Sequence, residues 1–326
     1  MLMLGRAQVR EVLEDADEEV LRAVREAYLC HQQGLTAVPH SVFLRFPDDD
    51  RNRIIALPAY LGGEDPVAGV KWIASFPANI ETDLPRANAV MILNSVRTGE
   101  PEALVEAATI SARRTAASAA LAAATLAAGT PDTGVTLFGC GVINGEVLRF
   151  LRTTLPGLTA VTVFDLDAGR ARSFAEASAA RYPTLTVEVA ESAAAALRAH
   201  RLVSLATTAG TPHLDAAYCP PGTLVLHLSL RDLSPATVLA STNIVDDADH
   251  VCRASTSLHL AEQEVGHRDF VTASLGSLLS GAPYRRPDDG LTVFSPFGLG
   301  ILDLAVARLV RRRAADQGVG TTLADF

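Results

Sequence analysis

A short apolar run that leads straight into a glycine-rich turn constrains the fold of this chain more than any other feature. Val135–Phe138 is typical of a buried strand, and the stretch Gly139-Cys140-Gly141-Val142-Ile143-Asn144 follows it and opens a helical segment. A helix that begins directly after a strand aims its unpaired backbone N–H groups and its positive dipole end at an anion. Gly139 would form the tight turn, and Gly141 would leave no Cβ in the path of a phosphate. The turn therefore predicts a pyrophosphate-binding loop.

The order of elements around this loop predicts a parallel sheet. From residue 133 onward, short β-rich runs alternate with helical stretches, a pattern typical of a sheet with helices on both faces. We therefore predict an α/β protein with a Rossmann doubly wound parallel sheet in a domain of residues 130–298. The expected strands are 135–138, 160–164, 185–189, 202–206, 224–228 and 243–245.

Asn144 stands where the usual dinucleotide fingerprint has its third glycine. That glycine normally allows the helix to pack closely on the strand. We expect Asn144 to meet this looser demand with its side chain pointing outward, because Gly145 lies beside it. A lone match to the fingerprint is weak, but the strand before the loop and the helix after it strengthen the interpretation.

The end of the second predicted strand indicates which dinucleotide the loop binds. Asp165 follows Gly139 by 26 residues, near the expected place of an acid that accepts hydrogen bonds from ribose hydroxyls and repels a 2′-phosphate. This favours NAD, although Arg170 and Arg172 leave NADP open. The residues expected to contact the cofactor are Gly139, Gly141, Val142, Ile143, Asn144, Asp165, Thr207 and Ser229.

The first part of the chain has a different, mixed pattern, which predicts an α+β substrate-binding and dimerisation domain over residues 1–129, completed by 299–326. We prefer a hairpin over 89–106 to a helix opening at Pro101. The basic run Arg311–Arg313 closes the last helix and suits the negative end of its dipole. The other elements expected here are helices over 6–13, 18–33, 109–128 (closed by Gly129) and 300–313, and strands over 53–60 and 67–76.

Composition excludes several classes of function. Lys and Arg total 28 against 37 Asp and Glu, so the surface repels polyanions and we expect no nucleic-acid partner. The four cysteines form no CxxC pair, which favours a reducing cytoplasm over a disulfide framework. Apolar runs fall short of the roughly 18 residues that a membrane span needs. The sequence has neither the histidine spacing nor the carboxylate cluster of a metal site, so we expect no metal. Cys140 is expected to be a packed side chain and not a reactive thiol.

Six segments together resemble the ornithine cyclodeaminase/mu-crystallin family over nearly the whole chain: "VKWIASFPANIETDLPRANAVMIL", "ISARRTAASAA", "FGCGVING", "LHLSLRDLSP", "NIVDD" and "LTVFSPFGLGILDLA". Within it, "IIALPAYLGG" and "KWIASFP" look most like the dehydrogenases of 2,3-diaminopropionate biosynthesis. Those enzymes use NAD to oxidise and hydrolyse N-(2-amino-2-carboxyethyl)-L-glutamate, giving 2,3-diaminopropionate and 2-oxoglutarate. The resemblance implies an NAD-dependent amino-acid dehydrogenase that forms a homodimer.

The resemblance also implies a set of site residues. Arg45, Lys71 and Arg114 would bind the substrate carboxylate, with Lys71 also in a catalytic role, and Asp232 would be the general base. Each residue also has a purely structural alternative. Arg45 could be a surface strand residue, and the Lys71 amine could reach the surface beside its strand. Arg114 could form an ion pair on the helix surface, and Asp232 could mark the start of a helix. Against the last, Ser234 and Pro235 already provide a helix cap.

Two further positions carry open alternatives. Cyclodeaminases of the family have Glu where Ala56 stands, which counts against a free diamine and suits a substrate richer in carboxylates. His227 could touch the cofactor or be hydrogen-bonded inside the strand layer. A cyclodeaminase, an imine reductase, an alanine dehydrogenase and a non-catalytic binding protein remain alternatives.

Overall fold

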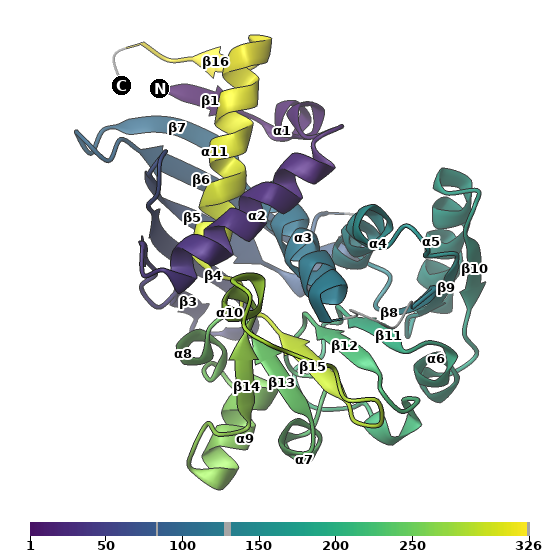
Figure 1. The fold of residues 1–326 in the computed structure, drawn as a ribbon. Helices are drawn as coiled ribbons and strands as arrows, with labels where there is room; N and C mark the ends of the chain where they lie inside the picture. The colour runs from purple at the N-terminus through teal and green to yellow at the C-terminus, as the bar shows by residue number, and fades with distance from the viewer. Residues whose placement is uncertain (83, 127–131, 325–326) are drawn as a thin grey trace. The chain divides into compact units, whose positions relative to one another are not determined.

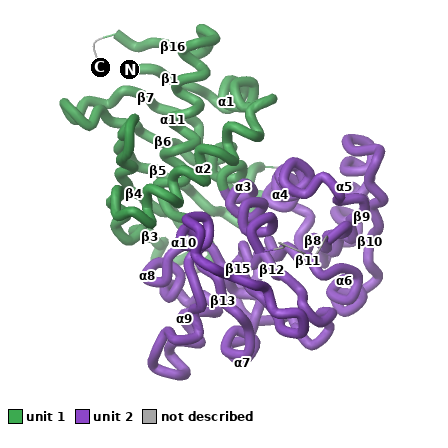
Figure 2. Tube along the Cα trace, in the orientation of Figure 1, with its two compact units in different colours: residues 1–114, 298–326 green, residues 115–297 purple. Residues whose placement is uncertain are grey.

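The computed structural model describes residues 1–82, 84–126 and 132–324, and the chain forms two compact units (Figures 1 and 2). Unit 1 comprises residues 1–114 and 298–326, and unit 2 comprises residues 115–297. The first boundary falls inside helix α3 (Ala108–Leu126), whereas the expected boundary after Gly129 lies outside the described residues. Among the described helices, none has both the length and the apolar character that a bilayer crossing requires.

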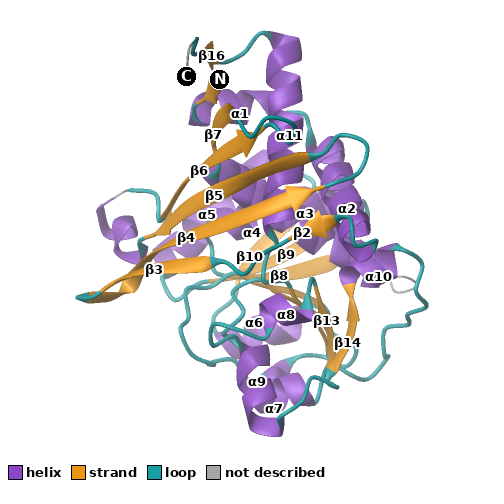
Figure 3. Ribbon diagram, turned by 90° about the vertical axis from the view of Figure 1, so that its left-hand side faces the viewer, coloured by secondary structure: helices purple, strands orange, loops and turns teal. Residues whose placement is uncertain are grey.

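Unit 1 is a mixed sheet that helices cover on one face (Figure 3). The strand order is β16-β1-β7-β6-β5-β4-β2, and β3 pairs with β4. Helices α2 and α11 pack on each other, and α11 also contacts β4, β5 and β6. The strands are β1 (Leu2–Leu4), β2 (Thr36–Ala37), β3 (Val42–Phe46), β4 (Asp49–Leu61), β5 (Val67–Ser75), β6 (Ala87–Asn94), β7 (Pro101–Glu106) and β16 (Thr321–Thr322); the helices are α1 (Arg6–Val12), α2 (Asp17–Gln32), η1 (Pro77–Thr82) and α11 (Gly300–Gln317).

Buried and exposed side chains alternate along the central strands, so the two faces of this sheet differ. On β6, Met91 and Leu93 are buried whereas Val90 and Ile92 are exposed. The hairpin β6–β7 confirms the preferred interpretation of residues 89–106, since Pro101 begins a strand. One side of the sheet therefore faces the helices, and an apolar side is left without cover in unit 1.

Unit 2 contains an all-parallel sheet in the order β10-β9-β8-β11-β12-β15-β13-β14, which confirms the predicted Rossmann architecture. The order reverses at β8, because β9 and β11 flank it. Open α/β sheets bind ligands beyond the carboxyl ends of the strands at such a point. The strands are β8 (Gly134–Phe138), β9 (Ala160–Phe164), β10 (Thr186–Val189), β11 (Leu202–Leu205), β12 (Leu224–His227), β13 (Thr242–Val245), β14 (Val271–Ser274) and β15 (Thr292–Ser295).

The helices of unit 2 follow its strands along the chain. They are α4 (Val142–Thr154), α5 (Ala168–Arg181), α6 (Ala193–Ala199), η2 (Ala216–Tyr218), α7 (Pro235–Leu239), α8 (Ala248–Val251), α9 (Ser257–Val265) and α10 (Leu275–Leu279). All six expected strands are present, but β14 and β15 were not predicted. Each has only four residues and no alternation of its own, so the sequence signal for them is weak.

The interpretation of the basic run in α11 is wrong. The helix continues to Gln317, and no basic residue lies in its last turn. Arg311 instead pairs with Glu102, and Arg313 pairs with Glu19. These side chains therefore hold α11 to its neighbours in unit 1 and leave the helix C-terminus to Gly318, whose left-handed conformation ends it.

Candidate active site

The glycine loop has the geometry that a close ligand requires. Gly139 has φ +86°, and a Cβ there would lie 2.5 Å from the Ala206 carbonyl oxygen, so only glycine fits. A Cβ on Gly141 would meet nothing within 4 Å, so the space before it is open. Gly141 begins α4 without a side-chain cap, whereas α5 to α10 are all capped by a side chain. The first N–H groups of α4 therefore need another partner.

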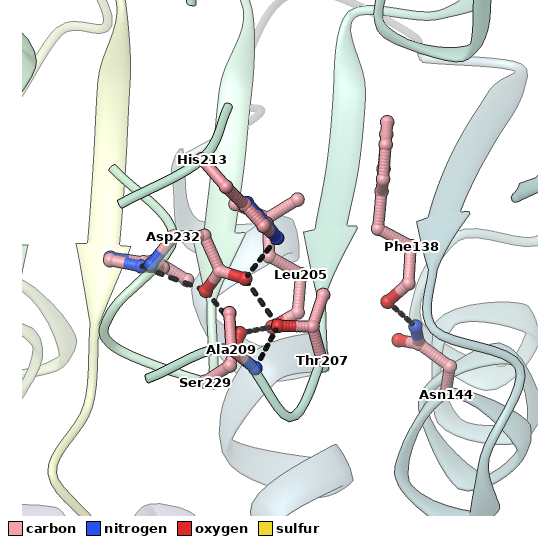
Figure 4. Close-up of polar contacts among 9 residues, drawn as sticks. Phe138, Asn144, Leu205, Thr207, Ala209, His213, Ser229 and Asp232 are labelled. Carbon is pink, nitrogen blue, oxygen red and sulfur yellow. Dashed lines mark hydrogen bonds and ion pairs between the residues drawn. The ribbon is translucent and has the colours of Figure 1, made fainter. Parts of the chain in front are cut away.

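Asn144 points inward, so the expectation of an outward side chain is wrong. Its Nδ2 donates to the carbonyl oxygens of Phe138 (2.7 Å, Figure 4) and Gly139 (2.8 Å). Its Oδ1 accepts a hydrogen bond from the Ser204 hydroxyl at 2.7 Å. The residue is fully buried. It gives the Gly139 carbonyl a donor and adds a second one to the Phe138 carbonyl, which also accepts from the Ala206 N–H. Asn144 thus fastens helix to sheet by hydrogen bonds where a glycine would do so by close packing.

Asp165 closes the loop from the second strand. Its Oδ2 accepts from the Cys140 backbone N–H at 2.8 Å, and its Oδ1 accepts from the Asp167 N–H at 3.0 Å. Arg170 lies 3.6 Å from the same carboxylate. Burial and Asp165 raise the pKa of the Cys140 thiol to about 12, so this cysteine packs as a neutral thiol, as expected. The ribose contact predicted for Asp165 stays a prediction.

Asp232 is fully buried in unit 2 at the carboxyl edge of its sheet (Figure 4). The hydroxyls of Thr207 and Ser229 each donate to one of its oxygens. Thr207 in turn accepts from the Ala209 N–H at 3.1 Å, and its Cα would lie 3.4 Å from a Cβ on Gly139. Two residues expected to line the cofactor therefore hold the expected base, directly beside the glycine loop.

The partners of Asp232 keep it ionised. Burial raises its pKa, but the hydrogen bond and charge of His227 and the hydroxyl donors Ser229 and Thr207 outweigh burial and hold the pKa below its usual value. His227 is fully buried. Its Nε2 accepts from the Asp232 backbone N–H at 3.2 Å and lies 3.2 Å from Asp232 Oδ2, and its Nδ1 lies 3.3 Å from the Ser295 hydroxyl. This confirms the interior role for His227. Ser234 caps α7 with Pro235 in its first turn, so Asp232 is not needed as the cap.

His213 also approaches Asp232, and sequence analysis missed it. Its Nε2 lies 3.6 Å from Asp232 Oδ1, and its side chain is 37% exposed. Its backbone N–H donates to the Asp232 carbonyl at 3.0 Å, and the isolated bridge Leu214–Leu233 continues this pairing. Nothing in the sequence pairs these two loops, because their contact depends on the adjacency of β11 and β12.

In unit 1 a second buried carboxylate, Asp303 of α11, brings two predicted cations together. Lys71 Nζ lies 2.6 Å from its Oδ2, and Arg114 Nε lies 3.1 Å from its Oδ1. Lys71 also donates to the Ser111 hydroxyl at 3.1 Å. Asp303 was not among the predicted site residues, although the four turn-like residues "PFGL" directly precede its helix. Gly298 has φ +94°, a conformation that favours glycine, and it lies against the Arg114 guanidinium.

Burial defines the state of Lys71. The side chain is 1% exposed, so the alternative in which its amine reaches the surface is wrong. Burial lowers the pKa of Lys71 to about 8, Asp303 raises it and Arg114 lowers it further. The amine is therefore still a cation at neutral pH and loses its charge in mildly alkaline solution.

The strand register separates the other two predicted positions from this pair. Arg45 is exposed on β3 and lies opposite Arg53 of β4, not beside Lys71. Ala56 lies opposite Trp72. Because successive side chains alternate between faces, Ala56 is on the sheet face opposite Lys71. The role of Ala56 in discriminating between substrates stays a prediction, and the register places it away from Lys71.

A model of the ornithine cyclodeaminase/mu-crystallin family matches residues 2–318. The chain is 28% identical to the N-((2S)-2-amino-2-carboxyethyl)-L-glutamate dehydrogenase of Staphylococcus aureus, over 99% of this chain and 98% of the relative. It is 29% identical to the alanine dehydrogenase of Archaeoglobus fulgidus, over 100% and 98%.

Solved structures match the whole chain as well. CmnK has a TM-score of 0.91 at 31% identity, covering 100% of this chain and 98% of that one. The Thermococcus litoralis Δ1-pyrroline-2-carboxylate reductase with NADH and L-proline has a TM-score of 0.91 at 27% identity, covering 99% and 100%. An archaeal alanine dehydrogenase dimer with bound NAD has a TM-score of 0.89 at 27% identity, covering 100% and 99%. The protein belongs to the ornithine cyclodeaminase/mu-crystallin family.

Proposed function

We propose that this protein is an NAD-dependent dehydrogenase that converts N-(2-amino-2-carboxyethyl)-L-glutamate to 2,3-diaminopropionate and 2-oxoglutarate. One observation carries the chemistry: Asp232 is fully buried beside the glycine loop, yet two hydroxyls and His227 hold it as a carboxylate. The full-length likeness to a dehydrogenase of that conjugate supports the substrate.

The residues present fit a dinucleotide. Gly139 and Gly141 leave room for a pyrophosphate, and α4 offers N–H groups that no side chain caps. Asp165, fixed by the loop backbone, would meet the ribose. When bound there, NAD⁺ supplies a hydride acceptor.

The chain's own residues account for the rest of the reaction. Lys71 and Arg114 bind a substrate carboxylate, and Asp303 keeps both cations in position. As hydride leaves the glutamate α-carbon, Asp232 takes the proton of the attached nitrogen and an imine forms. Asp232, once deprotonated, then draws a proton from the water that adds to the imine carbon. Asp232 passes that proton to the imine nitrogen, which gives a carbinolamine. The carbinolamine hydroxyl then loses its proton, which moves through Asp232 to the same nitrogen as the carbon–nitrogen bond breaks, so that 2-oxoglutarate and a neutral amine form.

His213 can carry the proton that Asp232 takes during imine formation to the solvent. The other described partners of the Asp232 side chain are buried or half-buried groups, whereas His213 reaches solvent and lies next to the carboxylate. An imidazole can accept and release protons near neutral pH. We therefore assign His213 the transfer of protons between Asp232 and water.

Incubation with NAD⁺ and the glutamate conjugate tests the activity. The expected result is NADH in equal amount to 2-oxoglutarate and 2,3-diaminopropionate, with L-alanine and L-ornithine as parallel substrates. Turnover of alanine alone, or proline formed from ornithine, would overturn the proposal.

We also propose that a second copy of the chain covers the open face of the unit 1 sheet, since one structural relative is a dimer. Trp72 and Val90 lie opposite each other on this face and both are exposed. A continuous exposed apolar surface of this kind is typical of an interface. Trp72→Glu should yield monomers by light scattering, and an unchanged dimer would exclude this face. The exposed apolar residues of these strands are Val42, Leu44, Tyr60, Trp72, Val90 and Ile92.

A further inference from the structure

Three arginines of unit 1 gather without an acidic partner among the side chains that the structure describes. Arg45 and Arg53 lie directly opposite each other on β3 and β4, and Arg86 precedes β6, where its carbonyl accepts from the Phe76 N–H at 2.9 Å. Burial and the charge of Arg45 lower the pKa of Arg53, and burial and the charge of Arg53 lower that of Arg86. Among the side chains that the structure describes, no carboxylate forms an ion pair with any of the three.

Two buried polar atoms at the same place also lack partners. Ser75 pairs with Arg53 on one side and with Ala87, next to Arg86, on the other. The Ser75 hydroxyl and the Arg86 Nε are both buried without a hydrogen bond in the described structure. Buried donors are nearly always satisfied in folded proteins. Converging cations and orphaned donors together describe a site for an anion.

The position of this group relates it to Lys71. Arg53 and Ser75 lie on the same face of the sheet as Lys71, because Leu57 opposes Lys71 and the residues are an even number apart. Four residues along a strand span about 13 Å, and the flexible arginine side chains can reach back over part of that distance. One elongated ligand can therefore contact both groups.

The charges favour a ligand with several carboxylates. Lys71 and Arg114 share Asp303 and retain a single net positive charge, which suits one carboxylate. Alanine, proline and ornithine have only one carboxylate and would leave the three arginines unpaired. The glutamate conjugate has three.

We infer that Arg45, Arg53, Arg86 and Ser75 form a second anion site, which binds the side-chain carboxylate of a polycarboxylate substrate. The inference rests on the proposed function and extends it, because the site selects a glutamate-derived substrate over simple amino acids. An arginine binds a carboxylate through two parallel N–H groups, and the Ser75 hydroxyl can donate a further hydrogen bond.

Binding of two matched ligands tests the site without requiring turnover. 2-Oxoglutarate and 2-oxopentanoate differ only in the terminal carboxylate, and calorimetry on the NADH-loaded protein measures the affinity for each. Wild-type protein should prefer 2-oxoglutarate. Arg53→Gln and Arg45→Gln, at a more exposed position, should each lower the affinity for 2-oxoglutarate about tenfold, the effect of one charged hydrogen bond. The affinity for 2-oxopentanoate should not change. Arg97→Gln, in the exposed β6–β7 turn, is the matched control.

Further measurements separate this site from other roles of the arginines. The melting temperature of Arg53→Gln should equal or exceed that of the wild type, because the substitution removes a cation that its neighbours repel. An unchanged preference for 2-oxoglutarate in both variants, or a loss of preference that occurs only with lower thermal stability or dissociation into monomers, would refute the site. If the preference depends on the arginines but the conjugate is not oxidised, the site stands and the proposed reaction is wrong.

Discussion

Among the described carboxylates, Asp303 in unit 1 and Asp232 in unit 2 are both 0% exposed, but the two have opposite partners. Asp303 lies between Lys71 and Arg114 and neutralises part of their charge. Asp232 is held by hydroxyls and histidines. A carboxylate between a lysine and an arginine is a counter-ion that positions them, whereas one held by hydroxyls and imidazoles, which can themselves exchange protons, can still accept a proton. Burial alone therefore does not identify a catalytic acid, and the partners decide its role.

The largest expected effect comes from removing the basic carboxylate. Asp232→Asn keeps the shape and the donors around the side chain but cannot accept a proton. We expect kcat for the glutamate conjugate to fall about a thousandfold, the usual contribution of a placed general base, while NADH affinity, measured by fluorescence titration, changes little.

Asp215→Asn is the matched control, because Asp215 is an exposed helix cap in the same region of unit 2. It should retain wild-type kcat. If Asp232→Asn also kept a kcat near the wild-type value, or lost NADH binding instead, the contrast between the two buried carboxylates would fail.

Removing the other carboxylate should act on folding more than on proton transfer. Asp303→Asn leaves Lys71 and Arg114 buried side by side without their shared anion. Breaking a buried ion pair from one side costs about 3 kcal/mol, so the free energy of unfolding measured in urea should fall by that amount. Asp316→Asn, an exposed change near the end of the same helix, should leave it unchanged; equal stability of the two variants would contradict this role for Asp303.

The two carboxylates also differ in how far the sequence reveals them. Asp232 follows a strand in a parallel sheet, whose regular order makes the carboxyl edge predictable. Asp303, the partner of Lys71, lies on the last helix of unit 1. Its contact with Lys71 depends on how α11 packs on β4 and β5, which no local sequence pattern encodes. The same register moved Ala56 to the other face and placed Arg45 with Arg53. His213 likewise depends on a contact between loops.

Asn144 shows how a local deviation from a motif is resolved in three dimensions. Asn144→Ala removes the side-chain partner of the Gly139 carbonyl and of the Ser204 hydroxyl, and leaves the Phe138 carbonyl only its bond from the Ala206 N–H. We expect the free energy of unfolding to fall by about 2 kcal/mol, since a buried group left unsatisfied costs roughly that much. Asn144→Gly restores the usual fingerprint but not the bonds, so it should be no more stable than Asn144→Ala in the same urea titration.

The charge of Lys71 provides a test by pH alone. Its pKa is lowered to about 8, so the amine is charged below that pH and neutral above it. KM for the conjugate should therefore rise about tenfold per pH unit above 8, the slope for loss of one proton. Stability should not fall for this reason, because a lysine with a lowered pKa in the folded state destabilises the protein below pH 8, and that penalty disappears as pH rises toward 10.5. Lys71→Arg, which stays charged, should remove the rise in KM; a rise of the same size in that variant would assign it to another group.

The smallest expected effect is at the exposed partner of the buried base. His213→Gln keeps Asp232 and its hydroxyl donors but removes the group that connects the carboxylate to solvent. The chemistry itself is intact, so we expect kcat to fall only about tenfold, less than for loss of the base, and KM to stay constant. Imidazole added to the buffer should restore part of the rate in His213→Gln and none in Asp232→Asn, because a diffusing base can replace a proton carrier at the surface but not a buried carboxylate. Equal rescue of both variants, or of neither, would show that protons reach Asp232 by another route.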